Sequence, residues 1–128
     1  MKRHDARKKA LQALFQLDST EMTVEEAIEY VLEEGQKTNA YLEQLVAGTT
    51  EHKEEIDAAL NDKLENWTLS RLPKIERTVL RLAVYELLYV EDTPNKVVLN
   101  EAIELSKVFG DEKSSKFVNG VLSKITAQ

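Results

Sequence analysis

The sequence predicts an all-α protein, a compact bundle of about seven helices arranged in two packed helical subdomains. Apolar residues recur at helical spacing almost throughout, and no alternating stretch is long enough to indicate a strand. Proline stands at positions 73 and 94, where the first turn of a helix tolerates it. A chain of 128 residues fits one domain, 1–128, with subdomains at about 1–66 and 67–128.

The first two helices have clear local signals. The first is expected from about Arg3 to Leu17, with one buried stripe formed by Ala6, Ala10, Ala13, Leu14 and Leu17. Thr23 and Glu26 have the spacing of a capping box, which opens a second helix, and Gly35 is expected to end it.

The middle of the chain is acidic and helical. From Thr38 or Asn39 the pattern predicts one long helix, or two helices that join near Gly48. Trp67 and Leu69 then indicate a short connecting turn that packs on the core.

Three helices follow in the last part of the chain. The stretch 75–90 is apolar nearly all round, so it is predicted to be the central helix. A helix over 94–109 comes next, and Gly110 ends it. Asp111 can then cap the last helix.

Composition excludes several classes of function. The chain has no cysteine, which excludes disulfides, thiolate metal sites and cysteine nucleophiles and is compatible with a reducing cytoplasm. No apolar run approaches 18 residues, and no apolar segment follows the charged N-terminus. We therefore expect neither a signal peptide nor a membrane span.

The net charge of −6 is unevenly distributed. Residues 1–9 carry five basic side chains against one acidic, whereas residues 18–65 carry fourteen carboxylates against three lysines. Residues 107–128 are again basic, with four lysines against two carboxylates. If the fold brings the two ends together, they form one positive patch that the net charge conceals.

Phe117 does not follow the pattern of its own helix. The predicted buried face consists of Val118, Val121, Leu122 and Ile125. At about 100° per residue, Phe117 lies roughly 90° from the centre of this face, in line with Lys113, Gly120 and Lys124. A ring flanked by ammonium groups is typical of a stacking surface for a nucleobase. Alternatively, the ring folds back and closes the edge of the core.

Two glutamates, Glu86 and Glu101, lie on apolar helix faces and could be an acid and base pair. The alternative is that each accepts hydrogen bonds or pairs with an arginine. The sequence has no nucleophile placed beside them, no Gly-rich phosphate loop and no metal-ligand cluster, since His4 and His52 stand alone.

Three further residues have open interpretations. His4 lies in the basic N-terminal segment, where it could contact a phosphate or a base, and His52 is expected to be a solvated surface residue. Phe15 lies on the flank of the first helix, away from its apolar stripe. It either packs under a neighbouring helix or forms a contact for a protein partner.

Several motifs resemble the NusB family of transcription antitermination factors. They are LRLAVYELLY (80–89), the Thr93-Pro94 pair, VVLNEAIELSKVFG (97–110) and KFVNGVL (116–122). The opening ARKKALQALFQLD (6–18) resembles the start of that family. The resemblance covers the whole chain and is strongest over about the last 55 residues.

The resemblance implies a helical fold with no enzymatic activity, no cofactor and no bound metal. It implies binding of the single-stranded boxA element of nascent ribosomal RNA transcripts together with NusE, a small-subunit ribosomal protein. Other Nus factors and RNA polymerase would complete this cytoplasmic assembly, which suppresses premature termination.

The resemblance also implies roles for individual residues. The basic RNA contacts fall on Lys2, Arg3, His4, Arg7 and Lys8. The KFVNGVL motif and its flanks supply Lys113, Lys116, Phe117 and Lys124. The surface facing NusE involves Phe15 and Glu76.

Two alternative functions remain open. Similar helical domains occur as the RNA-binding part of ribosomal RNA cytosine methyltransferases, so the chain could be a detached module of that kind. It could also be a protein-interaction scaffold whose basic ends serve only solubility.

Overall fold

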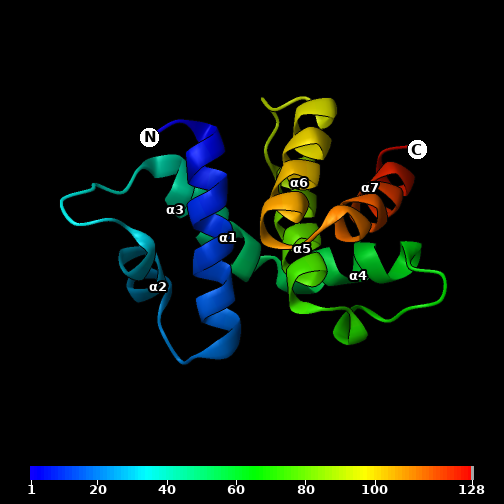
Figure 1. Cartoon of the computed structure of the whole chain (residues 1–128), viewed down its shortest axis with the longest axis horizontal. Helices are drawn as coiled ribbons and strands as arrows, with labels where there is room; N and C mark the ends of the chain where they lie inside the picture. Colours follow the sequence, from blue (N-terminus) through cyan, green and yellow to red (C-terminus); the bar gives the residue numbers. More distant parts are fainter. Residues whose placement is uncertain (128) are drawn as a thin grey trace. The chain divides into compact units, whose positions relative to one another are not determined.

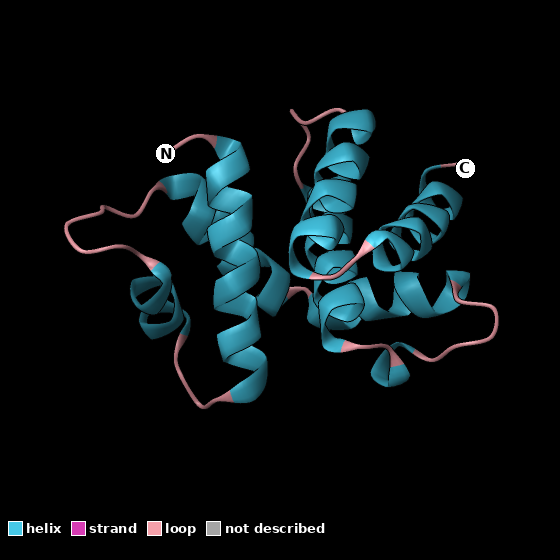
Figure 2. Cartoon of the chain, viewed as in Figure 1, coloured by secondary structure: helices cyan, strands magenta, loops and turns pink. Residues whose placement is uncertain are grey.

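The computed structural model describes residues 1–127, which form helices joined by loops (Figure 1). No strand is present in this part of the chain, as the colouring by secondary structure shows (Figure 2). The elements are α1 (Arg3–Ser19), α2 (Val24–Val31), α3 (Ala40–Glu51), α4 (Lys53–Lys63), the 3₁₀ turn η1 (Leu69–Arg71), α5 (Lys74–Tyr89), α6 (Asn95–Phe109) and α7 (Glu112–Thr126). The predicted fold class and the number of helices are confirmed.

The helices group into two units, Met1–Glu51 and His52–Gln128. The sequence places the internal boundary later, near residue 66. The boundary differs because α4 packs on α5 and α7. The Arg81 guanidinium also donates to both carboxylate oxygens of Asp57, at 2.8 and 3.0 Å, and this bidentate pair fastens α4 to α5.

In the first unit, α2 and α3 pack against α1 and against each other (Figure 1). The α1 core residues are Ala6, Ala10, Leu11, Ala13 and Leu14. Leu11 is fully buried and Leu17 only half-buried, so the predicted stripe is wrong at these two positions. A stripe of small and branched residues does not reveal from sequence which side the neighbouring helices cover.

Local capping sets the limits of α2 and α3. The Thr23 hydroxyl accepts from the amide of Glu26, and the Glu26 carboxylate accepts from the amide of Thr23, which confirms the capping box. The α2 helix ends at Val31, before the predicted end, and Gly35 lies in the following loop with a φ of +78°. Asn39 Oδ1 accepts from the amide of Leu42 at 2.8 Å and thereby caps α3.

The acidic segment consists of two helices that meet at His52, and not at Gly48, which is buried inside α3. His52 keeps 39% of its side chain exposed, as expected of a surface residue, but it also makes ring contacts that the sequence did not predict. Its ring stacks on Tyr89 with centroids 4.1 Å apart, and the Tyr85 ring stacks on Tyr89 at 5.4 Å. This contact depends on α5, which is remote in sequence, so the local acidic pattern gives no sign of it.

In the second unit, α5 is the central helix, and α4, α6 and α7 all contact it. Pro73 and Pro94 directly precede α5 and α6, as predicted. Gly110 ends α6, and the Asp111 carboxylate accepts from the amide of Ser114 at 2.8 Å at the start of α7. The α7 core contains Val118, Val121 and Leu122, whereas Ile125 is only half-buried.

Trp67 departs from its predicted place. Leu69 packs on the core with 3% of its surface exposed, but Trp67 is 54% exposed. The turn therefore uses leucine as its anchor and leaves the tryptophan ring largely in solvent. Within residues 1–127, no helix combines the length and the apolar character needed to cross a membrane.

Candidate nucleic-acid interface

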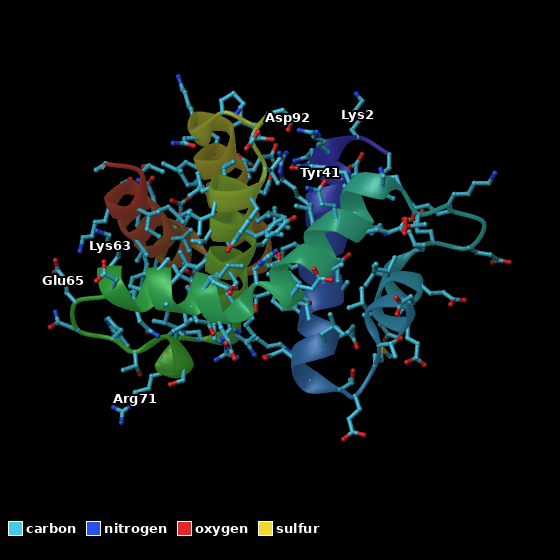
Figure 3. The ribbon with its side chains drawn as sticks, turned by 180° about the vertical axis from the view of Figure 1, so that it is seen from behind. Lys2, Tyr41, Lys63, Glu65, Arg71 and Asp92 are labelled. Carbon is cyan, nitrogen blue, oxygen red and sulfur yellow. The ribbon has the colours of Figure 1, made fainter. Side chains whose placement is uncertain are left out.

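The basic N-terminal segment lies at the start of α1 in the first unit. Lys2, Arg3, His4 and Lys8 are all exposed. The Arg3 guanidinium lies over the ring of Tyr41, with its central carbon 4.1 Å from the ring centroid. Figure 3 shows Tyr41 beside the start of α1 and the Lys2 side chain directed away from the ribbon. A cation over an aromatic face is attracted by the ring quadrupole, so Tyr41 limits the positions of Arg3.

Arg7 differs from its exposed neighbours. Only 3% of its surface is exposed, and its guanidinium carbon lies 5.7 Å from the centroid of the same Tyr41 ring. A buried arginine against a ring acts more readily as a support for the segment than as a free phosphate contact. Sequence reasoning overlooked Tyr41 because an aromatic residue in an apolar helix gives no local sign of cations from another helix.

Phe117 is half-buried and lines an open hollow of about 590 Å³ in the second unit. Trp67, Pro73 and Ile75 supply further apolar walls of this hollow, and Glu76 and Lys113 are among its polar lining residues. Both interpretations of Phe117 therefore describe part of its position: one part of the ring packs on the protein and another borders open space.

Three of the predicted lysines, Lys113, Lys116 and Lys124, lie on α7 with Phe117. Lys113 and Lys116 are exposed. A Cβ atom added at Gly120 would meet no atom within 4 Å, so the helix surface there is open to a close approach. Lys124 forms an ion pair with Glu65 at 3.0 Å, so its charge is partly balanced by the loop that follows α4.

Glu76 and Phe117, for which the sequence suggests different partners, line the same hollow. The Ser114 hydroxyl donates to Glu76 Oε1 at 2.6 Å, which joins the first turn of α5 to the first turn of α7. The hydrogen bond from the backbone amide of Ser114 is the main cause that lowers the pKa of the Asp111 carboxyl, and Lys113 has a smaller effect in the same direction. Phe15, the other predicted partner contact, is half-buried in α1 of the first unit.

The two groups of predicted RNA contacts belong to different units of the chain. The first unit brings Arg3 and Arg7 to one ring, and the second brings Lys113, Phe117 and Glu76 to one hollow. A single positive patch formed by both chain ends stays a prediction.

Glu86 and Glu101 have different environments. Glu86 in α5 is 2% exposed, whereas Glu101 in α6 is half-buried. Across residues 1–127, no group of three or more His, Cys, Asp or Glu side chains could hold a metal ion.

Exposed basic side chains and a half-buried ring beside an open hollow, all carried by helices, define the class of a helical nucleic-acid-binding protein. The sequence model of the NusB family matches residues 4–127. The chain belongs to the NusB family. Because this family is non-enzymatic, the catalytic interpretation of Glu86 and Glu101 is abandoned.

Individual relatives agree with this assignment over nearly their whole length. The transcription antitermination protein NusB of Lysinibacillus sphaericus (strain C3-41) is 69% identical over 128 residues, which cover 100% of this chain and 99% of that protein. Among solved structures, T. maritima NusB has a TM-score of 0.90 at 37% identity and covers 100% of this chain and 92% of that chain. A crystal structure of antitermination factors NusB and NusE in complex with dsRNA has a TM-score of 0.85 at 34% identity, and the match covers 99% of this chain and 98% of that chain.

Proposed function

We propose that this chain acts in transcription antitermination by binding the boxA element of nascent ribosomal RNA transcripts together with NusE. Other Nus factors and RNA polymerase complete the assembly, which works in the bacterial cytoplasm. The observation that carries the proposal is Phe117, a ring that borders an open hollow beside exposed lysines. The similarity to named antitermination proteins over the full chain supports it, as does a structural neighbour that contains NusE and RNA.

Phe117 is assigned to base recognition. Single-stranded RNA is read from unstacked bases that lie on aromatic or guanidinium planes. One such stack contributes roughly 1–3 kcal/mol and depends little on the identity of the base. Lys113 lines the same hollow as the ring, Lys116 and Lys124 lie on the same helix, and all three are assigned to phosphates.

The segment at the start of α1 is assigned to phosphate contacts. Lys2, Arg3, His4 and Lys8 are exposed there, whereas Arg7 is buried in the same helix against the Tyr41 ring. We expect about four of the side chains assigned in the two units to contact phosphates at one time, which would give a slope of log affinity against log salt near −3, at roughly −0.7 per contact for single strands. One ring and a few cations bind weakly, so a partner that extends the RNA surface is expected.

NusE is assigned to two contacts, Phe15 in the first unit and Glu76 in the second. Phe15 keeps part of its ring at the surface of α1. Glu76 offers a carboxylate in the first turn of α5. A half-exposed aromatic residue is a typical anchor of a protein interface, and charged groups are common at the rim of such interfaces.

Filter binding of labelled boxA RNA across a salt series tests the proposal. Wild type should bind boxA more tightly than a scrambled RNA of the same composition, with a slope near −3, and NusE should strengthen the binding. Phe117→Ala should weaken it, whereas Val108→Ala, at a 61% exposed apolar residue of α6, should leave it unchanged.

A boxA duplex is the second comparison. Bases inside an A-form duplex remain stacked, so Phe117 cannot reach them, and preference for the boxA sequence should fall. Equal affinity for boxA and scrambled single strands, with and without NusE, would refute the proposal and favour a scaffold.

A further inference from the structure

Trp67 is a large aromatic side chain that the fold exposes on an anchored loop. It is the only tryptophan of the chain, and 54% of its surface is accessible. Two residues later Leu69 is buried, and its amide donates to Asn61 Oδ1 of α4 at 3.2 Å. The loop therefore holds the ring at a defined place in solvent. Single exposed apolar side chains are common on protein surfaces, so the exposure of Trp67 is informative only together with the hollow that it lines.

Trp67 and Phe117 line the same hollow although they come from different segments, the loop before η1 and helix α7. Neither ring stacks on another ring among the described residues. No other ring in residues 1–127 covers Trp67 or the part of Phe117 that borders the hollow. The volume of about 590 Å³ falls within the range of about 300–1,000 Å³ that is usual for small-ligand pockets.

The polar groups at this hollow distinguish between possible occupants. Ser114 donates its amide to Asp111 and its hydroxyl to Glu76, so both carboxylates already accept a hydrogen bond. Lys113 adds an exposed ammonium group. A flat ring that carries a phosphate can use the aromatic walls and the ammonium group together, whereas an aliphatic side chain of a protein partner can use only the walls.

The geometry points to a pocket for one nucleobase of the bound RNA, in which Trp67 is a second stacking surface beside Phe117 and Lys113 pairs with the phosphate of that nucleotide. The inference rests on the proposed function and deepens it. The pocket is continuous with the Phe117 surface already assigned to RNA. The pocket is formed by three segments, residues 67, 72–76 and 110–117, so no single sequence motif predicts it.

Tryptophan fluorescence gives a direct test, because Trp67 is the only emitter of its kind in the chain. Titration of the wild-type chain with single-stranded boxA RNA should quench the emission, with the same midpoint as filter binding. In a series of RNAs that each carry one abasic site, quenching should be lost at one position and kept at the others. Equal quenching across the series would mean that phosphates alone approach Trp67, and the pocket would be rejected.

Variants provide the second measurement. Trp67→Ala should weaken boxA binding by roughly 5- to 150-fold, the range given by the loss of one stacked base. Trp67→Phe, which keeps a smaller ring, should lose less. Tyr30→Ala removes a similarly exposed ring from α2, 63% accessible against 54% for Trp67, and should bind as wild type does. Urea unfolding of all three variants should match wild type, since the rings are largely in solvent.

The outcomes separate this pocket from the function on which it rests. If wild type shows no preference for boxA, the proposed function fails. If wild type prefers boxA, but Trp67→Ala binds equally well and the emission does not change, only the pocket fails. If Trp67→Ala instead weakens NusE binding without RNA and leaves RNA affinity intact, the hollow is a protein-docking site and the inference is overturned.

Discussion

Tyr41→Leu should loosen the basic segment without removing any of its charge. Tyr41 lies under two guanidinium groups, that of exposed Arg3 at 4.1 Å and that of buried Arg7 at 5.7 Å. A cation over a ring contributes about 0.5–1 kcal/mol at exposed sites and up to about 2 kcal/mol when desolvated. Because the Arg7 contact is long, we expect the two together to contribute about 1–2 kcal/mol to the stability of the first unit.

RNA binding should respond in a characteristic way. Tyr41→Leu keeps every positive charge, so the dependence of log affinity on log salt should keep its slope near −3. The affinity itself should fall by roughly 2- to 5-fold at every salt concentration, which corresponds to a loss of about 0.5–1 kcal/mol of binding free energy because Arg3 is no longer held in place. Arg3→Ala, in contrast, removes one contact and should make the slope shallower by about 0.7.

Filter binding across a salt series and urea unfolding measure these effects, with Tyr41→Phe as the matched control. Phenylalanine keeps the aromatic face, so this variant should retain most of the affinity and stability. If Tyr41→Leu and wild type have equal RNA affinity and equal unfolding midpoints, the ring does not position the arginines and the reasoning is wrong.

Four other substitutions test separate parts of the molecule. Phe117→Ala should lower boxA affinity by roughly 5- to 150-fold with little change in the urea midpoint, because the half-buried ring lies beside the α7 core; a large loss of stability would show that it belongs to the core. Phe15→Asp should abolish NusE binding in a pull-down while the circular dichroism spectrum stays helical, and unchanged NusE affinity would contradict its assignment. Gly110→Ala should lower the free energy of unfolding by about 1–3 kcal/mol in urea, because the new Cβ would lie 2.8 Å from the backbone oxygen of Ser106 and from Ser114 Oγ. If the variant is as stable as wild type, both oxygen atoms can shift to make room for the new Cβ. The lowered pKa of Asp111 contributes stability that is present above the ordinary carboxyl pKa and is lost as pH falls through the lowered pKa. The urea midpoints of wild type and Asp111→Asn should therefore become equal on acidification. A difference between the midpoints that does not change with pH would show that the ionised Asp111 cap is not its cause.

Features set by neighbouring residues in the sequence could be predicted, because their chemistry is local. The Thr23 capping box, the prolines before α5 and α6, and the Asp111 cap all depend on groups within one helical turn of one another. The flank position of Phe117 also followed from periodicity, and this was enough to single out the residue.

Features that depend on distant segments could not be predicted. The exposure of Trp67 depends on Leu69 being the residue that reaches the core. The burial of Arg7 and its contact with Tyr41 require α1 and α3 to be side by side. The hollow beside Phe117 similarly needs the start of α5, the start of α7 and the loop before η1 to meet. The periodicity of apolar residues describes one helix at a time and contains no information about contacts between distant segments.

The distribution of arginine and lysine within the basic segment follows from the ring of Tyr41. Arginine stands at the two positions whose side chains reach that ring, residues 3 and 7. Lysine stands at the others: Lys2 and Lys8 face solvent, and Lys9 donates its ammonium to the carbonyl oxygen of Val31 at 2.9 Å. A planar, weakly hydrated guanidinium can stack, whereas a compact, strongly hydrated ammonium prefers water or a single acceptor. We therefore expect exchange of the two residue types to be tolerated at Lys2 and Lys8 and disfavoured at Arg3, Arg7 and Lys9, although every exchange conserves the charge.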